Sequence, residues 1–245
     1  MENSQKKVSV LKSTYNSESW VSHSIESILK QSYKNIEFLI VDDCSTDNTF
    51  GILQEYSKKY ERIKVFKNDL NIGLTKSLNL LIAKSNGDFI ARQDDDDISY
   101  PDRIKTQVEI LLNSNADFCS TRALTNPEKN KIPGISYYLP IKVLLKFKNP
   151  FIHGTLLLKK EILKGVGGYD ENFYYSQDLK LIVDLIQKGY NYKIINKVLY
   201  VLNTQNNISK NKFQEQEYYA YCARKGIKPN LIVWKFLSIM QEKIG

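Results

Sequence analysis

The sequence predicts an α/β fold with a mostly parallel central sheet flanked by helices, and a small helical extension at the C-terminus. Two observations predict this class. Short apolar runs alternate with amphipathic stretches through the first half of the chain, which is typical of βαβ units. Polar clusters follow several of these runs, where the carboxyl ends of parallel strands commonly bind ligands.

The strands expected in the first half are the short apolar runs, which cover residues 8–11, 36–41, 63–66 and 89–91. Helices are expected between them because apolar side chains recur there at helical spacing. The expected helices cover residues 17–31, a stretch after a cap at Ser45, Thr46 or Asp47, residues 74–82, and a segment opened by Pro101.

The second half of the chain is less regular. Residues 123–150 contain four prolines and are expected to form loops with one short helix near 141–147. Apolar patterns then predict strands at 155–158, 192–195 and 198–202, helices at 160–164 and 178–188, a turn at 165–169, and a helical tail from Phe213.

Composition narrows the class of protein. A hydrophobic content of 42% is ordinary for a soluble globular protein, and 245 residues form one large domain or a core with an appendage. No segment approaches the roughly 18 apolar residues of a membrane span. The polar start and three scattered cysteines predict a reduced, cytoplasmic protein without a signal peptide. The net charge of +8 is consistent with a solvated lysine-rich surface or with an anionic partner. No nucleic-acid-binding motif is present, so nucleic acid is not the expected partner.

The acidic run Asp94-Asp95-Asp96-Asp97 follows the strand expected at 89–91. Adjacent carboxylates repel one another, so a cation, solvent or hydrogen-bond donors must offset that repulsion. Hard oxygen ligands suit Mg²⁺ or Mn²⁺, which proteins hold with one or two carboxylates plus substrate phosphates. The alternative is an exposed acidic turn that caps the helix at Pro101.

Asp42-Asp43 ends another expected strand. Asp43 is either a cap of the following helix or an acceptor for an imide N–H, the group that uracil offers.

An ordered series of motifs resembles family 2 glycosyltransferases, which have the GT-A fold with a Rossmann-like sheet. The opening motifs are Val8-Ser9-Val10-Leu11-x-Ser13-Thr14-Tyr15-Asn16 and Val41-Asp42-Asp43-x-Ser45-Thr46-Asp47. Asn71-x-Gly73-Leu74 and the stretch from Gly87 through Asp97 to Arg103 continue the match. His153-Gly154-Thr155, Gly167-Gly168-Tyr169-Asp170-Glu171 and Gln177-Asp178 resemble the acceptor part.

The resemblance implies a division of the chain. Residues 1–210 would form the GT-A domain, with a nucleotide-sugar-binding half over about 1–122 and an acceptor-binding half over 123–210. Residues 211–245 would form the helical tail.

The resemblance also implies roles for single residues. Asp178 matches the general base, and Asp96 would contact a Mn²⁺ or Mg²⁺ ion on the diphosphate. The remaining positions that would bind the nucleotide sugar are Ser13, Tyr15, Asp43, Arg92, Asp94 and Asp95. From the residues alone, Asp178 is equally readable as a helix N-cap. His153 is either a packed histidine or a contact to the diphosphate or acceptor.

Two departures from the family pattern bear on the site. Lys12-Ser13 stands where relatives often have isoleucine-proline, at the edge of the base pocket. Asn203 stands where relatives often have a histidine that completes the metal shell, so we expect Asn203 or water to fill that place.

The function implied is inverting transfer of a sugar from a UDP-sugar to a glycan or lipid-linked glycan, in surface polysaccharide biosynthesis. Residues 230–237 are apolar with nearby lysines, and are expected either to pack on the core or to make a peripheral contact with the inner face of the plasma membrane. The alternatives are a metal-dependent nucleotidyltransferase, which normally brings a glycine- and arginine-rich triphosphate loop absent here, and a catalytically silent nucleotide-sugar-binding module.

Overall fold

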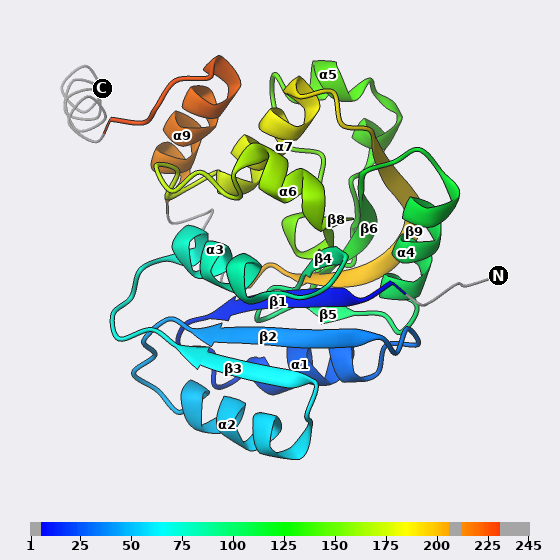
Figure 1. Ribbon diagram of the computed structural model, residues 1–245. Coiled ribbons are helices and arrows are strands. Elements are labelled where there is room, and N and C mark those ends of the chain that lie inside the picture. The colour runs from blue at the N-terminus through cyan, green and yellow to red at the C-terminus, as the bar shows by residue number, and fades with distance from the viewer. Residues whose placement is uncertain (1–5, 206–211, 231–245) are drawn as a thin grey trace.

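The structure is a computed structural model that describes residues 6–205 and 212–230 (Figure 1). One mixed sheet runs through the molecule in the order β3-β2-β1-β4-β8-β6-β9-β5, with β7 paired to β6. Its first four strands are parallel to one another and comprise β1 (Val8–Thr14), β2 (Ile36–Asp42), β3 (Ile63–Lys67) and β4 (Phe89–Arg92). These strands confirm the predicted parallel arrangement of the first half.

Helices cover both faces of this parallel part. Helices α1 (Val21–Leu29) and α2 (Thr49–Lys59) lie on one side of the sheet, and α3 (Leu74–Lys84) lies on the other (Figure 1). Alternate residues of one strand therefore enter different cores: Val10 packs with Ile25 of α1, whereas Leu11 packs with Leu78 of α3. Helix α4 (Arg103–Asn113) contributes to the same core as α1.

The second half completes the sheet with pairs of both directions. Strand β8 (Leu157–Lys159) runs antiparallel to β4 and to β6 (Phe118–Asn126). Strand β9 (Tyr192–Asn203) runs parallel to β6 and antiparallel to β5 (Ile98–Ser99), and β7 (Lys131–Ile132) is antiparallel to β6. The sheet is therefore less uniformly parallel than predicted, because this half adds antiparallel pairs.

The helical elements of the second half are short except for α7 and α9. They are the 3₁₀ turns η1 (Ile135–Tyr138) and η2 (His153–Thr155), and the helices α5 (Ile141–Leu144), α6 (Lys160–Val166), α7 (Gln177–Gln187) and α9 (Phe213–Lys225). The predicted C-terminal helix is confirmed as α9, which packs beside α7. The segment 231–245 lies outside the described residues, as does most of the apolar stretch 230–237.

Several predicted bounds were wrong. Residues 123–126 are not a loop but the end of β6, which pairs with β9 along this stretch and with β7 at Ala123 and Leu124. Its polar residues give no strand periodicity in the sequence. The two strands predicted at 192–195 and 198–202 form the single strand β9, with an irregularity where it pairs with Arg122. The predicted strand at 155–158 begins two residues later, after η2.

One helix start and one helix end also differ from prediction. The first helix begins at Val21 rather than near Ser17, and α6 continues through Gly165 and Val166, where a turn was expected. Asp178 is not an N-cap, because Ser176 holds that position in a left-handed conformation (φ 52°). No helix within the described ranges is long and apolar enough to cross a membrane.

Candidate functional site

The candidate site begins where three neighbouring parallel strands end. Thr14 of β1 pairs in register with Asp42 of β2, and Arg92 of β4 pairs with Leu11 of β1. The backbone N–H of Asp43 donates to the carbonyl of Thr14 at 2.9 Å. Asp42-Asp43 and the acidic run therefore meet at one edge of the sheet, as their places after successive strands predict.

Donors from the first strand and the loop after it hold Asp95. Its Oδ2 accepts hydrogen bonds from the hydroxyl of Thr14 at 3.2 Å and from the hydroxyl of Ser17. The Lys12 ammonium lies 3.4 Å from the Asp95 carbonyl. The side chain of Asp95 is therefore used to fix the loop, rather than to present a free carboxylate.

Lys12 is a fully buried lysine beneath the acidic run. Burial lowers the pKa of Lys12 to about 8, and the negative charges of Asp95, Asp94, Asp96 and Asp97, in that order, oppose this effect. An isoleucine, which relatives often carry here, brings no charge. Lys12 thus supplies a fixed cation that offsets part of the repulsion among the four carboxylates.

Buried arginines hold Asp94 and the loop around it. The Arg92 guanidinium donates to Asp94 Oδ1 at 2.6 Å and to the carbonyl of Leu11 at 2.7 Å. Arg103 donates to the carbonyls of Arg92 at 3.0 Å and Gly154 at 3.2 Å. A Cβ at Gly154 would lie 2.6 Å from Asp94 Oδ2, so this position has no room for a side chain. Arg92, which the resemblance places among the nucleotide-sugar-binding residues, therefore supports the loop that carries Asp94.

Asp97 is the buried carboxylate of the acidic run. It is 2% exposed, and its Oδ1 accepts the backbone N–H of Asn203 at 2.7 Å. Burial raises the pKa of Asp97 well above its ordinary value, with further increases from Asp94 and Asp96. Tyr200 also hydrogen-bonds to Asp97, so this aspartate ties the acidic run to β9.

Asp96 is the carboxylate of the run that makes no hydrogen bond to another residue in the described ranges. Burial, with the charges of Asp95 and Asp94, raises the pKa of Asp96 to about 6. A cation bound there would remove that penalty. Within those ranges no three acidic, histidine or cysteine side chains gather around one point. The donor set therefore fits a Mg²⁺ or Mn²⁺ ion held by one carboxylate and by phosphate oxygens.

Asp43 holds a loop of the donor side. Its Oδ1 accepts hydrogen bonds from the Asn68 side-chain amide at 2.7 Å and the Ile72 backbone N–H at 3.0 Å, and its Oδ2 accepts from Gly73 N–H at 2.8 Å. Asp43 does not cap α2, whose Thr49 N–H donates to Asp47 instead. One lone-pair position on Oδ2 remains for a base N–H, so base binding by Asp43 stays a prediction.

The other donor-side residues lie at the same edge. Tyr15 is 46% exposed and Ser13 is half-buried, which leaves the Tyr15 ring free to stack on a flat ligand. Asn203 is buried beside Asp97, and its Oδ1 accepts the N–H of Gln205 at 3.1 Å. Its amide nitrogen has no hydrogen-bond partner among the residues described.

Asp178 lies in the first turn of α7, where the helix N-terminus favours negative charge. Its Oδ2 accepts one hydrogen bond, from the Asn149 side-chain amide at 2.8 Å. The preceding Ser176 donates its hydroxyl to the carbonyl of Gln216 in α9 at 2.9 Å. Helix α9 thus fixes the strained turn that orients Asp178.

His153 and Tyr169 connect Asp178 to the acidic run. His153 Nε2 and the Tyr169 hydroxyl are 2.8 Å apart. Burial and the charge of Arg92 lower the pKa of His153 to about 3, against an opposing effect of Asp178. Burial also raises the pKa of Tyr169, and the charges of Arg92, Asp178 and Asp94 all act on this phenol. The lowered pKa keeps His153 neutral, and a direct contact of His153 to diphosphate or acceptor stays a prediction.

Sequence reasoning missed several residues that shape the site. Asn149, Ser17 and Tyr200 gave no motif of their own, because each acts through a partner far away in sequence. Tyr169 lies in a quoted motif, but its pairing with His153 was not predicted. Lys12 did carry a signal, since it departs from the family pattern in an otherwise apolar strand.

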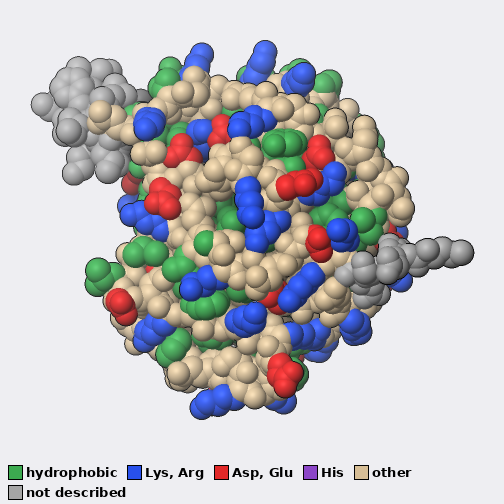
Figure 2. All heavy atoms as spheres, in the orientation of Figure 1, with side chains coloured by type: hydrophobic (Ala, Val, Ile, Leu, Met, Phe, Trp, Pro, Cys, Tyr) green, Lys and Arg blue, Asp and Glu red, His purple; other side chains and the backbone are tan. Residues whose placement is uncertain are grey.

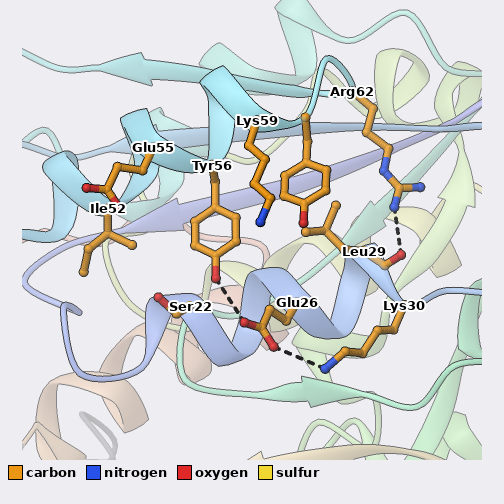
Figure 3. Close-up of a pocket in the computed structure, with 10 residues that line it drawn as sticks. Ser22, Glu26, Leu29, Lys30, Ile52, Glu55, Tyr56, Lys59 and Arg62 are labelled. Carbon is orange, nitrogen blue, oxygen red and sulfur yellow. Dashed lines mark hydrogen bonds and ion pairs between the residues drawn. The ribbon is translucent and has the colours of Figure 1, made fainter.

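The described residues also line a groove of about 680 Å³ between α1 and α2 (Figure 3). Tyr56 donates to Glu26 across it at 3.2 Å, and Lys30 pairs with the same carboxylate at 3.2 Å. It contains none of the predicted site residues, so the chemistry does not depend on it.

Comparison with known proteins then decides the family. The profile of Glycosyl transferase family 2 matches residues 9–167. The chain belongs to this family. As a family 2 member it is a glycosyltransferase, which confirms the resemblance seen in the motifs.

Two family 2 relatives match most of the chain. A Bacillus subtilis protein named as the glycosyltransferase EpsE is 35% identical over 203 residues, covering 81% of this chain and 73% of EpsE. WbnJ of Escherichia coli, named as an O-antigen biosynthesis glycosyltransferase, is 29% identical over 243 residues, covering 95% and 93% of the two chains.

Solved structures share the fold of this family 2 chain. A 1–349 fragment of S. aureus TarS in complex with UDP-GlcNAc gives a TM-score of 0.73 at 19% identity, over 93% of this chain and 69% of the fragment. The mannosyltransferase PcManGT of Pyrobaculum calidifontis, in complex with GDP-Man and Mn²⁺, gives 0.72 at 18% identity, over 91% and 66%. The GT-A type of α/β fold is thereby confirmed.

Proposed function

We propose that this family 2 enzyme is an inverting glycosyltransferase that moves a sugar from a UDP-sugar to a glycan or lipid-linked glycan during surface polysaccharide assembly. One observation carries the proposal. Asp94 of the acidic run and Asp178, far apart in sequence, both act on the pKa of the Tyr169 phenol, and neither Asp178 nor Asp96 beside Asp94 has its carboxylate fully engaged. Inverting transfer needs one carboxylate for the leaving diphosphate's cation and one for the acceptor proton.

We assign the donor to the edge formed by β1, β2 and β4. Tyr15 would stack on uracil, Ser13 and Asp43 would border it, and Asp94 would lie near the ribose, with Asp95 and Arg92 fixing the loop. The TarS complex with UDP-GlcNAc supports a uridine nucleotide on this fold. We further assign residues 1–122 to the donor half and 123–210 to the acceptor half.

Asp96 would hold Mn²⁺ or Mg²⁺, with His153 and Asn203 as further candidates for contacts to the diphosphate or acceptor. When bound, such an ion supplies Lewis-acid stabilisation of the charge that grows on the departing diphosphate. The PcManGT complex with Mn²⁺ supports a metal on this fold. Lys12 adds a fixed positive charge below the same loop.

Asp178 would act as the general base. The acceptor hydroxyl oxygen attacks the anomeric carbon as the bond from that carbon to the diphosphate breaks, and the hydroxyl proton passes to Asp178. Asn149 holds one carboxylate oxygen at 2.8 Å and leaves the other for that proton. Attack opposite to the leaving group inverts the anomeric configuration.

The deciding experiment incubates the full chain and its Asp178→Asn variant with a panel of UDP-sugars, an acceptor extract and Mn²⁺. Release of UDP by the native chain alone supports the proposal. Release of pyrophosphate from UTP would instead identify a nucleotidyltransferase. No release with any donor, despite nucleotide-sugar binding, would identify a silent binding module.

The expected location is the cytoplasm, with a peripheral contact at the inner face of the plasma membrane. The sequence offers residues 230–237 for that contact, and nearly all of them lie outside the described residues. The described surface offers a separate basis for such a contact.

A further inference from the structure

The segment 135–148, which we call the ridge, exposes several large apolar side chains. Ile135 is 86% exposed and Tyr138 and Phe147 are each 73% exposed, with Leu139 and Val143 about half exposed. Scattered exposed apolar residues are ordinary on a protein surface, whereas several on one short segment mark an interaction surface.

The ridge is nevertheless a folded element with a buried side. Ile141, Leu144 and Leu145 lie in the hydrophobic core, and they alternate with the exposed positions through α5 and the turn after it. Arg224 of α9 donates to the carbonyl of Leu145 at 3.0 Å and to that of Phe147 at 2.9 Å. The outward apolar side chains therefore stand on an anchored backbone.

The charge of this region is of one sign. The stretch from Lys129 to Lys160 contains seven lysines and no aspartate or glutamate. On the ridge Lys142, Lys146 and Lys148 are exposed, and none of them forms an ion pair with another described residue. Figure 2 shows basic and hydrophobic side chains together at the top of the molecule, where Figure 1 places α5.

The ridge also adjoins the candidate base. The residue that follows it is Asn149, whose side-chain amide donates to Asp178 Oδ2 at 2.8 Å. Whatever the ridge contacts therefore lies close to the acceptor side of the site.

We propose that the ridge docks on an anionic phospholipid bilayer. Apolar and aromatic side chains enter the boundary between headgroups and acyl chains, while interleaved lysines pair with anionic headgroups. A polyanionic glycan would engage the lysines but leave Ile135, Tyr138 and Phe147 in water. An anionic membrane accommodates both the exposed apolar side chains and the lysines. This docking goes beyond the transfer reaction and does not depend on it.

The test is flotation of the full chain with phosphatidylcholine vesicles and with vesicles that also contain phosphatidylglycerol. We expect binding to the anionic vesicles only, decreasing as salt increases. The double variant Lys142→Glu/Lys146→Glu should lower the partition coefficient at least about tenfold. The matched control, Lys58→Glu/Lys105→Glu, makes the same change of charge at exposed lysines on α2 and α4 and should change it less than about twofold.

A second variant, Tyr138→Ser/Phe147→Ser, keeps every lysine and should remove the binding that persists at high salt. Equal losses in the ridge and control lysine variants would overturn the proposal, because net charge alone would explain them. Unchanged binding in both ridge variants would also overturn it and would direct attention to residues 231–245. Loss in the lysine variant alone would overturn it in favour of a polyanion site. Thermal unfolding of each variant checks that the fold is retained.

Discussion

The proposed donor and acceptor halves hold their candidate carboxylates in different ways. On the donor side Asp43, Asp95 and Asp97 each accept hydrogen bonds from groups far away in sequence, and Asp94 pairs with a buried arginine. On the acceptor side Asp178 has one such bond, on a helix whose start is fixed by α9. A bound diphosphate needs many fixed groups, whereas a base must keep one oxygen free for a proton. The difference predicts where substitutions remove binding and where they remove only turnover.

The largest effect is expected on the acceptor side. Asp178→Asn should lower kcat by about a thousandfold while binding of the UDP-sugar, followed by thermal shift, is retained. The control is Asp184→Asn, on the same helix, where the carboxylate pairs with Lys180. Loss of donor binding in Asp178→Asn would contradict the separation of the two halves.

Asp96→Asn should act on binding instead. Removal of the free carboxylate should abolish the Mn²⁺-dependent part of the thermal shift by UDP and lower turnover on the order of a hundredfold. Asp102→Asn, at the exposed start of α4, is the control. If Mn²⁺ still enhances UDP binding in Asp96→Asn, another group holds the ion.

The pH dependence sharpens the comparison on the donor side. Because the pKa of Asp96 is about 6, Mn²⁺-dependent UDP binding should weaken about tenfold per pH unit below 6. Without metal the sign is opposite. The pKa of Asp96 is higher in the folded protein than in the unfolded chain, so protonation of Asp96 stabilises the fold. This stabilisation is complete below the ordinary pKa near 4 and is lost as the pH rises through about 6.

Melting temperatures between pH 5 and 8, measured with and without Mn²⁺ and UDP, test both signs. In the Asp96→Asn variant, neither the Mn²⁺-dependent UDP binding nor the metal-free stability should show the pH dependence expected of Asp96. An unchanged series would mean that another group titrates.

The smallest effect is expected for Lys12→Met, which removes a buried charge and keeps a long side chain. The Lys12 charge lowers the pKa of Asp96, so its removal should move the acidic limb of Mn²⁺ binding to higher pH. At pH 6.5 we expect roughly threefold weaker binding, with recovery at pH 8. Lys105→Met, on the surface of α4, should leave the profile unchanged. A uniform loss at every pH would indicate misfolding rather than lost charge.

The sequence predicted the donor side well because its signals are local. Each strand from β1 to β4 is a short apolar run, and each polar cluster directly follows one, so the strands and the edge where these clusters gather can be predicted from neighbouring residues. The prediction was wrong at the end of β6, where a loop was expected from residue 123. Pairing with β9, and with β7 at Ala123 and Leu124, makes residues 123–126 part of a strand.

By itself, the sequence determined the fold class and the family, and it selected Asp96 and Asp178 as candidate site residues, since ordered motifs carry all three. Only the tertiary structure decided which carboxylates are engaged and which are free. Asp43 holds the loop from Asn68 to Gly73, and Asn149 holds Asp178, through contacts between residues 25 or more positions apart. The physical reason is that periodicity reports a residue's neighbours along the chain, whereas the ionisation and hydrogen bonding of a buried carboxylate depend on the residues that folding brings to it.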